Sequence, residues 1–124
     1  MDQEILVKSG QSLVRAMDTA GISPRVAVWI HNTDTNTWKL WLVPPKGFND
    51  KRAFYRKIAD ILSSKQGEVA GLEVSDTEMV PDSHPAMKGL GRFLKVTGLA
   101  SVFFTGNRFN GYYLPDGIIL RSDL

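Results

Sequence analysis

The chain has 124 residues, a formal net charge of +2 and no cysteine. A chain of this length is expected to form one domain, residues 1–124, with a core of its own. The absence of cysteine excludes a disulfide framework, a thiol nucleophile and a cysteine-bound metal site. The N-terminus lacks the build of a signal peptide, and no apolar run approaches the ~18 residues of a membrane span, so we expect a cytoplasmic protein with no membrane partner.

An amphipathic helix and a β-hairpin are predicted in the first third of the chain. Residues 2–20 carry apolar side chains at helical spacing, and Gly10 lies on the same stripe, which favours close approach of another element. Residues 25–31 and 37–43 have the composition of strands, and the polar residues 32–36 join them into a hairpin.

Both strands of this hairpin are apolar on both faces. Strands of this kind are usually central in a sheet and covered twice, so core packing is the first interpretation of Trp29 and Trp41. The alternative is that part of the tryptophan surface contacts a second subunit or another protein. Trp29 and Trp41 are therefore interface candidates.

Two further helices and an edge strand are predicted in the middle of the chain. Asn49 or Asp50 is suited to cap a helix that runs to about residue 65 and ends before Gly67. Residues 72–80 alternate imperfectly, which favours a strand at the edge of the sheet. The run Ser83-His84-Pro85 has the pattern of a helix start, with the proline at the first helical position.

Basic side chains concentrate where the second helix is expected to begin. Lys46 precedes this helix, and Arg52 and Arg56 fall in its first two turns, where the helix dipole disfavours positive charge. Such a placement would suit an anion, for example a phosphate group or nucleic acid, held by the free N–H groups of the helix. The alternative is a solvated helix face whose charges are screened by salt. The net charge by itself is too small to indicate nucleic-acid binding.

The last quarter of the chain is predicted to form a three-stranded antiparallel meander. A two-residue turn at Gly106-Asn107 would place Phe104 opposite Phe109 across the first hairpin. The strands are expected at about 100–105, 108–114 and 118–121. In this register the core face carries Ala100, Val102, Phe104, Phe109, Tyr113 and Ile119.

A polar row is expected on the opposite face of the meander. It contains Arg108, Asn110 and Tyr112, with Asn107 in the turn. Arginine suits a planar anion, asparagine an amide or base edge, and tyrosine stacking with a polar end. These four residues are ligand-binding candidates, and the alternative is an exposed sheet face beside a turn.

No catalytic motif is complete in the sequence. The run Gly89-Leu90-Gly91 lacks the third glycine of a dinucleotide fingerprint, and there is no P-loop, zinc-protease or nucleophile-elbow motif. A small hydrolase or nuclease would need His84 to converge with Asp76 or Asp82 in one cleft. The alternative for His84 is local helix capping. No metal site and no cofactor are expected, because the acidic residues fit no ordered metal-binding loop.

These elements predict an α+β fold in the order α-β-β-α-β-α-β-β-β. A mostly antiparallel sheet of about five or six strands would carry about three helices, mainly on one face. Because no catalytic constellation is complete, we expect a non-catalytic binding or protein-interaction module that is able to form a homodimer. An anion-, phosphate- or nucleic-acid-binding domain is one alternative function, and a small hydrolase or nuclease is another.

Overall fold

The helices and strands of the computed structural model follow the predicted order. The structure describes residues 3–65, 69 and 71–124, so Asp2 and Gly67, at the predicted ends of two helices, lie outside the described residues. The elements are α1 (Gln3–Thr19), β1 (Val26–Asn32), β2 (Thr37–Val43), α2 (Lys51–Ser64), the 3-10 helix η1 (Val74–Asp76), β3 (Thr77–Met79), α3 (Pro85–Phe93), β4 (Val102–Phe104), β5 (Asn107–Phe109), β6 (Tyr112–Leu114) and β7 (Gly117–Ser122). The α+β class is therefore confirmed.

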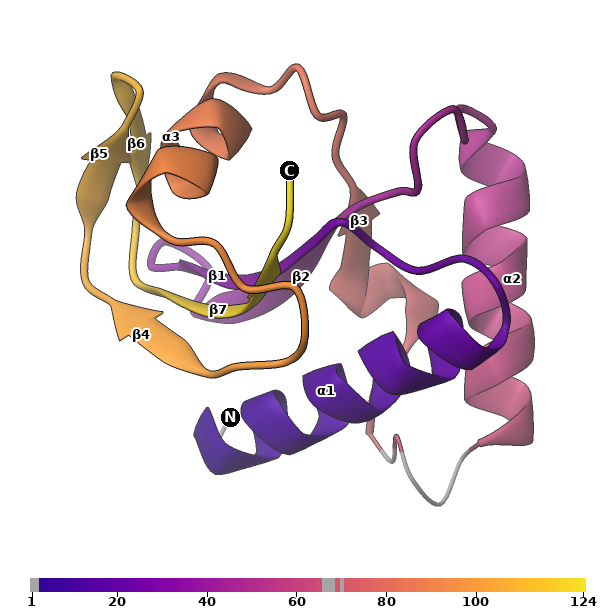
Figure 1. Cartoon of the computed structure of the whole chain (residues 1–124). Coiled ribbons are helices and arrows are strands. Elements are labelled where there is room, and N and C mark those ends of the chain that lie inside the picture. The colour runs from indigo at the N-terminus through magenta and orange to yellow at the C-terminus, as the bar shows by residue number, and fades with distance from the viewer. Residues whose placement is uncertain (1–2, 66–68, 70) are drawn as a thin grey trace.

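The main sheet has five strands in the order β3-β2-β1-β7-β4 (Figure 1). β1 pairs with β2 and with β7, and β4 pairs with β7, all antiparallel, whereas β3 runs parallel to β2. The parallel pair arises because α2 and η1 form a crossover between β2 and β3, so the sheet is mixed rather than wholly antiparallel. β5 and β6 form a separate two-stranded sheet.

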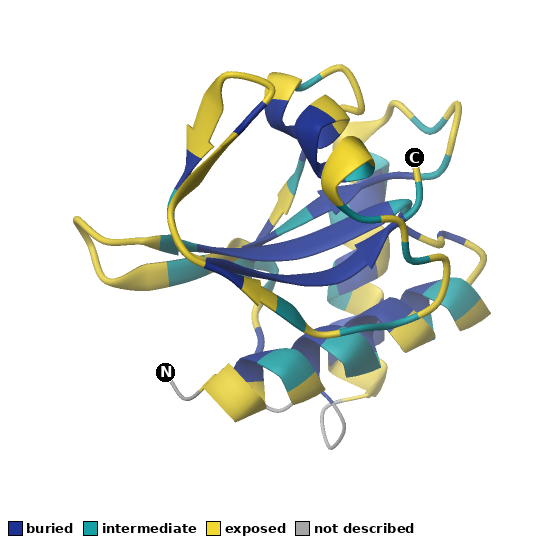
Figure 2. Cartoon of the chain, turned by 60° about the vertical axis from the view of Figure 1, so that its left-hand side comes forward, coloured by how far each residue is buried: buried dark blue, intermediate teal, exposed yellow. Residues whose placement is uncertain are grey.

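Both faces of the main sheet are covered. α1 and α2 pack on one face, so the helices lie mainly on that face as expected, and the short helix α3 packs on the other with the β5–β6 hairpin (Figure 1). Figure 2 shows the buried central strands between these two layers. All six residues of β7 are buried, as are the first five of β1. The double apolar pattern of the first hairpin thus indicated its central place correctly.

The contact between α1 and β1 is close because Gly10 has no side chain. A Cβ atom at Gly10 would lie 2.6 Å from Nε1 of Trp29 and 2.6 Å from Cδ1 of Leu120. The Trp29 indole donates its N–H to the Leu6 carbonyl at 2.8 Å, and the residue is only 1% exposed. The prediction of close packing at Gly10 is confirmed, and Trp29 lies in the core, where no partner chain can reach it.

A bidentate ion pair joins β7 to the end of α1. Nη1 and Nη2 of Arg121 donate to the two carboxylate oxygens of Asp18, each at 2.8 Å. Nε of Arg121 donates to the Gly98 carbonyl at 3.0 Å, which holds the loop before β4 against the sheet. Arg121 is 7% exposed, so these partners replace the water that its guanidinium loses on folding.

The turn of the C-terminal hairpin was predicted at the wrong place. The tight turn lies at Asn110-Gly111, where both residues have positive φ, 53° and 79°. Asn-Gly is the preferred pair for such a turn, because both central residues of a type I′ turn need positive φ. β5 therefore pairs with β6, Phe109 opposite Tyr112, and the predicted pairing of Phe104 with Phe109 as strand neighbours is wrong.

β4 instead crosses to β7, which lies beyond the hairpin in the chain. Phe104 pairs with Gly117, where a Cβ atom would lie 2.6 Å from the Trp29 carbonyl oxygen, so only glycine fits there. The core face was predicted correctly for Phe104, Phe109 and Ile119, which are buried, and incorrectly for Tyr113, which is 56% exposed.

The predicted strand over residues 72–80 is much shorter in the structure. Only Thr77–Met79 forms a strand, although it does lie at an edge of the sheet as expected. η1 takes up the preceding residues, because the Glu73 side chain and the Asp76 side chain cap each other's backbone N–H groups. Local capping therefore displaces the start of the strand.

The Asp18–Arg121 pair generates a prediction for the dependence of stability on pH. We expect Asp18→Asn to lower the free energy of unfolding by roughly 1–3 kcal/mol near neutral pH, because a buried guanidinium loses its counter-charge while solvent at the carboxylate tempers the effect. The hydrogen bonds from Arg121 lower the pKa of the Asp18 carboxyl below its ordinary value. The contribution is therefore complete above about pH 4 and is lost as pH falls through the lowered pKa.

Urea unfolding of the wild type and of Asp18→Asn across this pH range measures the effect. The difference in unfolding free energy between the two proteins should shrink with acidification. A difference that stays constant or grows below about pH 4 would contradict the assignment.

The packing of α3 on the β5–β6 hairpin generates a second prediction. A Cβ atom at Gly89 would lie 2.5 Å from the carbonyl carbon of Phe109 and 2.6 Å from the amide nitrogen of Asn110. We expect Gly89→Ala to destabilise the protein by about 1–3 kcal/mol, because the hairpin backbone must move away. Gly91→Ala in the same helix is the matched control, since its Cβ would only touch Leu124 at 3.7 Å.

The Gly91→Ala control should be neutral or stabilising by up to about 1 kcal/mol, since alanine favours a helix over glycine. Urea unfolding compares both variants with the wild type. Equal effects of the two substitutions would show that the hairpin is not docked on α3 at Gly89.

Candidate interaction surface

The two edges of the main sheet differ in how they are protected. Edge strands expose unpaired backbone groups, and proteins usually protect them with charged side chains or proline. At the β3 edge, Glu78 is exposed within the strand and Pro81 and Asp82 follow it. At the β4 edge, residues 100–107 contain no charged residue and no proline. The β4 edge is therefore open to pairing with another strand.

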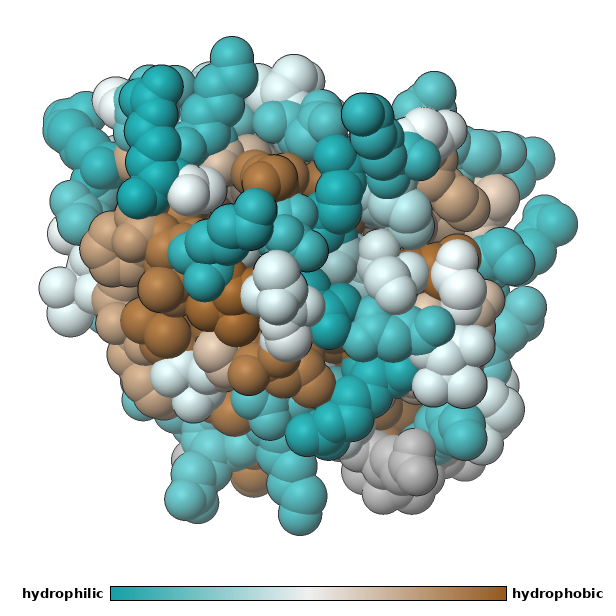
Figure 3. Space-filling view, viewed as in Figure 1, coloured by the Kyte–Doolittle hydropathy of each residue, from teal (hydrophilic) through white to brown (hydrophobic). Residues whose placement is uncertain are grey.

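Large apolar side chains flank this open edge. Phe103, in the middle of β4, is 53% exposed, and Phe93 at the end of α3 is 51% exposed. Both line a shallow groove of about 510 Å³, together with Trp38 and Phe104. Figure 3 shows the broadest hydrophobic area of this face in its left half, where β4 and α3 lie in Figure 1. We call Trp38, Phe93, Phe103 and Phe104 the β4 surface.

The outer backbone groups of β4 have no strand partner in the described chain. β4 pairs with β7 on its inner side only and is the last strand of the sheet. Phe103 projects toward the α1 side, where it also lines a second groove with Val7 and Gln11. Unpaired backbone groups beside an exposed phenylalanine form the combination that strand-addition interfaces use.

The predicted polar row does not share one face. In the β5–β6 hairpin, Arg108 pairs with Tyr113, whereas Tyr112 pairs with Phe109. Successive residues of a strand point to opposite faces, so Arg108 lies on the outer face and Tyr112 on the inner one. Asn110 occupies the turn and is exposed. The side chain of Asn107 accepts a hydrogen bond from the Arg108 backbone N–H at 2.8 Å, which orders this strand end.

Tyr112 instead joins an aromatic cluster that the sequence did not indicate. The His84 ring lies 4.6 Å from the Tyr112 ring and 5.4 Å from the Trp41 ring, both in edge-to-face geometry. Trp41 on β2 is half-buried by this contact. The cluster joins β2, the start of α3 and β6, elements whose proximity only the tertiary fold reveals. It fixes the turn end of the hairpin against the sheet, where Tyr112 pairs with Phe109, the residue that also contacts Gly89.

The residues considered for hydrolysis do not converge. Nδ1 of His84 accepts the Ala86 backbone N–H at 3.1 Å, so His84 caps α3. Asp82 pairs with Arg25 at 3.1 Å, and Asp76 accepts a hydrogen bond from the Glu73 backbone. In the described part of the chain, no hydrogen bond links His84 to either carboxylate, and no group of three or more histidine or acidic side chains could hold a metal ion. Local capping accounts for His84.

The basic residues at the start of α2 lie on an exposed surface. Lys46, Arg52 and Arg56 are all exposed, and the two arginines are one helical turn apart. The Asp50 carboxylate accepts the Ala53 backbone N–H at 3.0 Å and so occupies a place that an anion would take at this helix end. This arrangement favours the solvated helix face over an anion site at the α2 N-terminus.

Comparisons with family models, with curated proteins and with solved structures found no match to this chain. Among the described residues, no helix is both long enough and apolar enough to cross a membrane. The case for a function therefore depends on the geometry of the chain itself.

Proposed function

We propose that the chain is a protein-interaction module that associates with a second copy of itself through the β4 surface. The observation that carries the proposal is the uncharged, proline-free edge strand with a half-exposed phenylalanine at its centre. An antiparallel pair of β4 strands would continue the sheet from one copy into the next. Both copies would use the same surface, related by a two-fold axis, which is the symmetry of most homodimers.

A second copy is the partner that suits this edge best. Two identical segments 100–107 bring no like charges together, because neither contains a charged residue. Burying the exposed half of each Phe103 contributes about 1 kcal/mol, and the backbone hydrogen bonds of the new strand pair add to it. β4 has only three residues, so the contact is smaller than a permanent interface and dimerisation should depend on concentration.

Light scattering coupled to size exclusion tests the proposal. The wild type should move from monomer to dimer between about 1 μM and 1 mM. Phe103→Lys should remain monomeric over the same range, because it places two positive charges against each other at the centre of the strand pair. More than half of Phe103 is exposed, so the variant should keep the unfolding midpoint of the wild type within experimental error.

Ile5→Lys is the matched control. Ile5 is 52% exposed, close to the value for Phe103, but it lies on α1 and lines neither groove beside Phe103. This variant should dimerise as the wild type does. A wild type that stays monomeric throughout, or an Ile5→Lys variant that loses association equally, would refute association through the β4 surface.

A further inference from the structure

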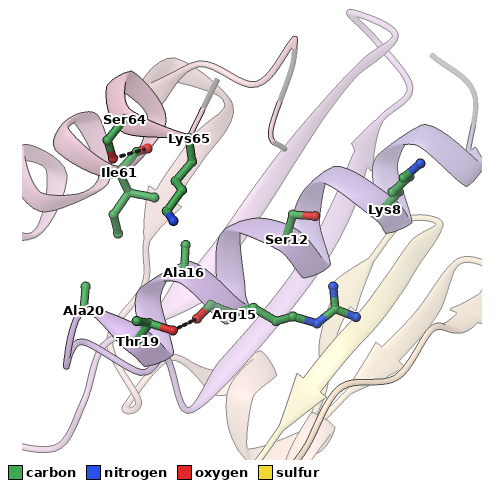
Figure 4. Close-up of a pocket in the computed structure, with 9 residues that line it drawn as sticks. All are labelled: Lys8, Ser12, Arg15, Ala16, Thr19, Ala20, Ile61, Ser64 and Lys65. Carbon is green, nitrogen blue, oxygen red and sulfur yellow. Dashed lines mark hydrogen bonds between the residues drawn. The ribbon is translucent and has the colours of Figure 1, made fainter. Parts of the chain in front are cut away.

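A groove with positively charged walls lies in the angle between α1 and the end of α2. Lys8 and Arg15 come from α1, and Lys65 follows the last turn of α2. Figure 4 shows Lys65 reaching from the end of α2 toward Ala16 on α1, with Arg15 extending along α1 in the direction of Lys8. The groove has a volume of about 690 Å³, within the range of small-molecule sites.

Among the described residues, none of the three cations has a partner in an ion pair. No acidic side chain in the described part of the chain lines the groove. The ion pairs among the described residues involve Arg25, Lys95 and Arg121, so none includes a cation of the groove. Positive charges that line one groove repel one another, and a bound anion reduces that repulsion.

Neutral side chains complete the groove. Ser12 lies between Lys8 and Arg15 on α1, and its half-buried hydroxyl makes no hydrogen bond to a described residue. By contrast, the Thr19 hydroxyl donates to the Arg15 carbonyl and is already engaged. Ala16 and Ile61 provide a small apolar floor. The groove thus offers three cations, one available hydroxyl and an apolar surface.

The spacing of the cations indicates the kind of anion. Lys8 and Arg15 are seven residues apart, which places them about 10 Å apart along the helix axis. With Lys65 contributing a third charge from α2, the cations of the groove span more than one phosphate, which favours a chain of phosphates. We propose that the groove binds an oligophosphate, either free or attached to a nucleoside whose base would rest on the apolar floor.

This site differs from the basic residues at the start of α2. Arg52 and Arg56 lie on an exposed helix surface near the Asp50 cap, whereas the groove has cations from two helices and no acidic lining among the described residues. Residues 39–65 carry seven basic side chains, and only the last of these, Lys65, reaches the groove. Its partners come from α1, far away in the sequence.

Isothermal titration calorimetry at low salt, without divalent metal, tests the proposal. The full chain is titrated with inorganic tripolyphosphate, with ATP and with adenosine. We expect both phosphate compounds to bind and adenosine not to bind. ATP binding more tightly than tripolyphosphate would assign the ligand to the nucleotides, and equal affinities would assign it to the phosphate chain alone. Failure of both phosphate compounds to bind overturns the proposal.

A pair of double variants separates the groove from general charge. Lys8→Gln with Arg15→Gln should weaken the binding of both phosphate compounds about tenfold or more. The control, Lys88→Gln with Arg92→Gln, removes two exposed cations from α3 on the opposite face of the sheet. It should bind as the wild type does, and an equal loss in the control would overturn the proposal. Lys8 and Arg15 also line the groove beside Phe103, so light scattering on the Lys8→Gln, Arg15→Gln variant is needed to show whether its association matches that of the wild type. Phosphate binding by the Phe103→Lys variant would separate the failure of the dimer from the failure of the anion site.

Discussion

Burial of β1 and β7 on both faces is the constraint on which the rest of the structure depends. Strands that are apolar on two sides need two covering layers. α1 and α2 supply one layer, while the short helix α3 supplies the other only with the help of the β5–β6 hairpin. Gly10 lets α1 pack closely on the sheet, and Gly89 lets α3 pack closely on the β5–β6 hairpin within its own layer. The chain thus covers both faces of its central strands with its own elements, and the candidate functional surfaces lie outside the core.

The first two-thirds of the fold could be predicted from sequence because its signals are local. Helical spacing gave α1, the Asp50 cap gave the start of α2, and the double apolar alternation gave the central hairpin. The C-terminal quarter failed because two turn signals competed. Asn110-Gly111 forms the turn, while Gly106 instead leaves room for the Tyr113 side chain. The pairing of β4 with β7 is a longer-range choice that no local pattern specifies.

The candidate surfaces could not be predicted from the sequence, because they depend on contacts between residues far apart in the chain. Trp41, His84 and Tyr112 had belonged to three separate hypotheses, yet the fold brings their rings together as a structural cluster. The cationic groove unites residues on α1 with Lys65, more than forty positions away in the chain. The β4 edge is the exception. Its uncharged run from 100 to 107 is visible in the sequence, but its meaning depends on knowing that the segment is an edge.

The two edges of the sheet, β3 and β4, differ in the side chains that protect them, and this difference supports the proposal that β4 is an interface. Water solvates the outer backbone groups of an edge strand. Charged residues and proline at such an edge prevent it from pairing with another chain, and an exposed apolar side chain has no role there. The β3 edge of the same sheet is protected in this way, by Glu78 within the strand and Pro81 after it. At β4, Phe104 packs in the core on the α3 side of the sheet, whereas Phe103 points to the α1 side and stays more than half exposed. The proposed pairing of β4 with a second copy would cover this exposed side chain.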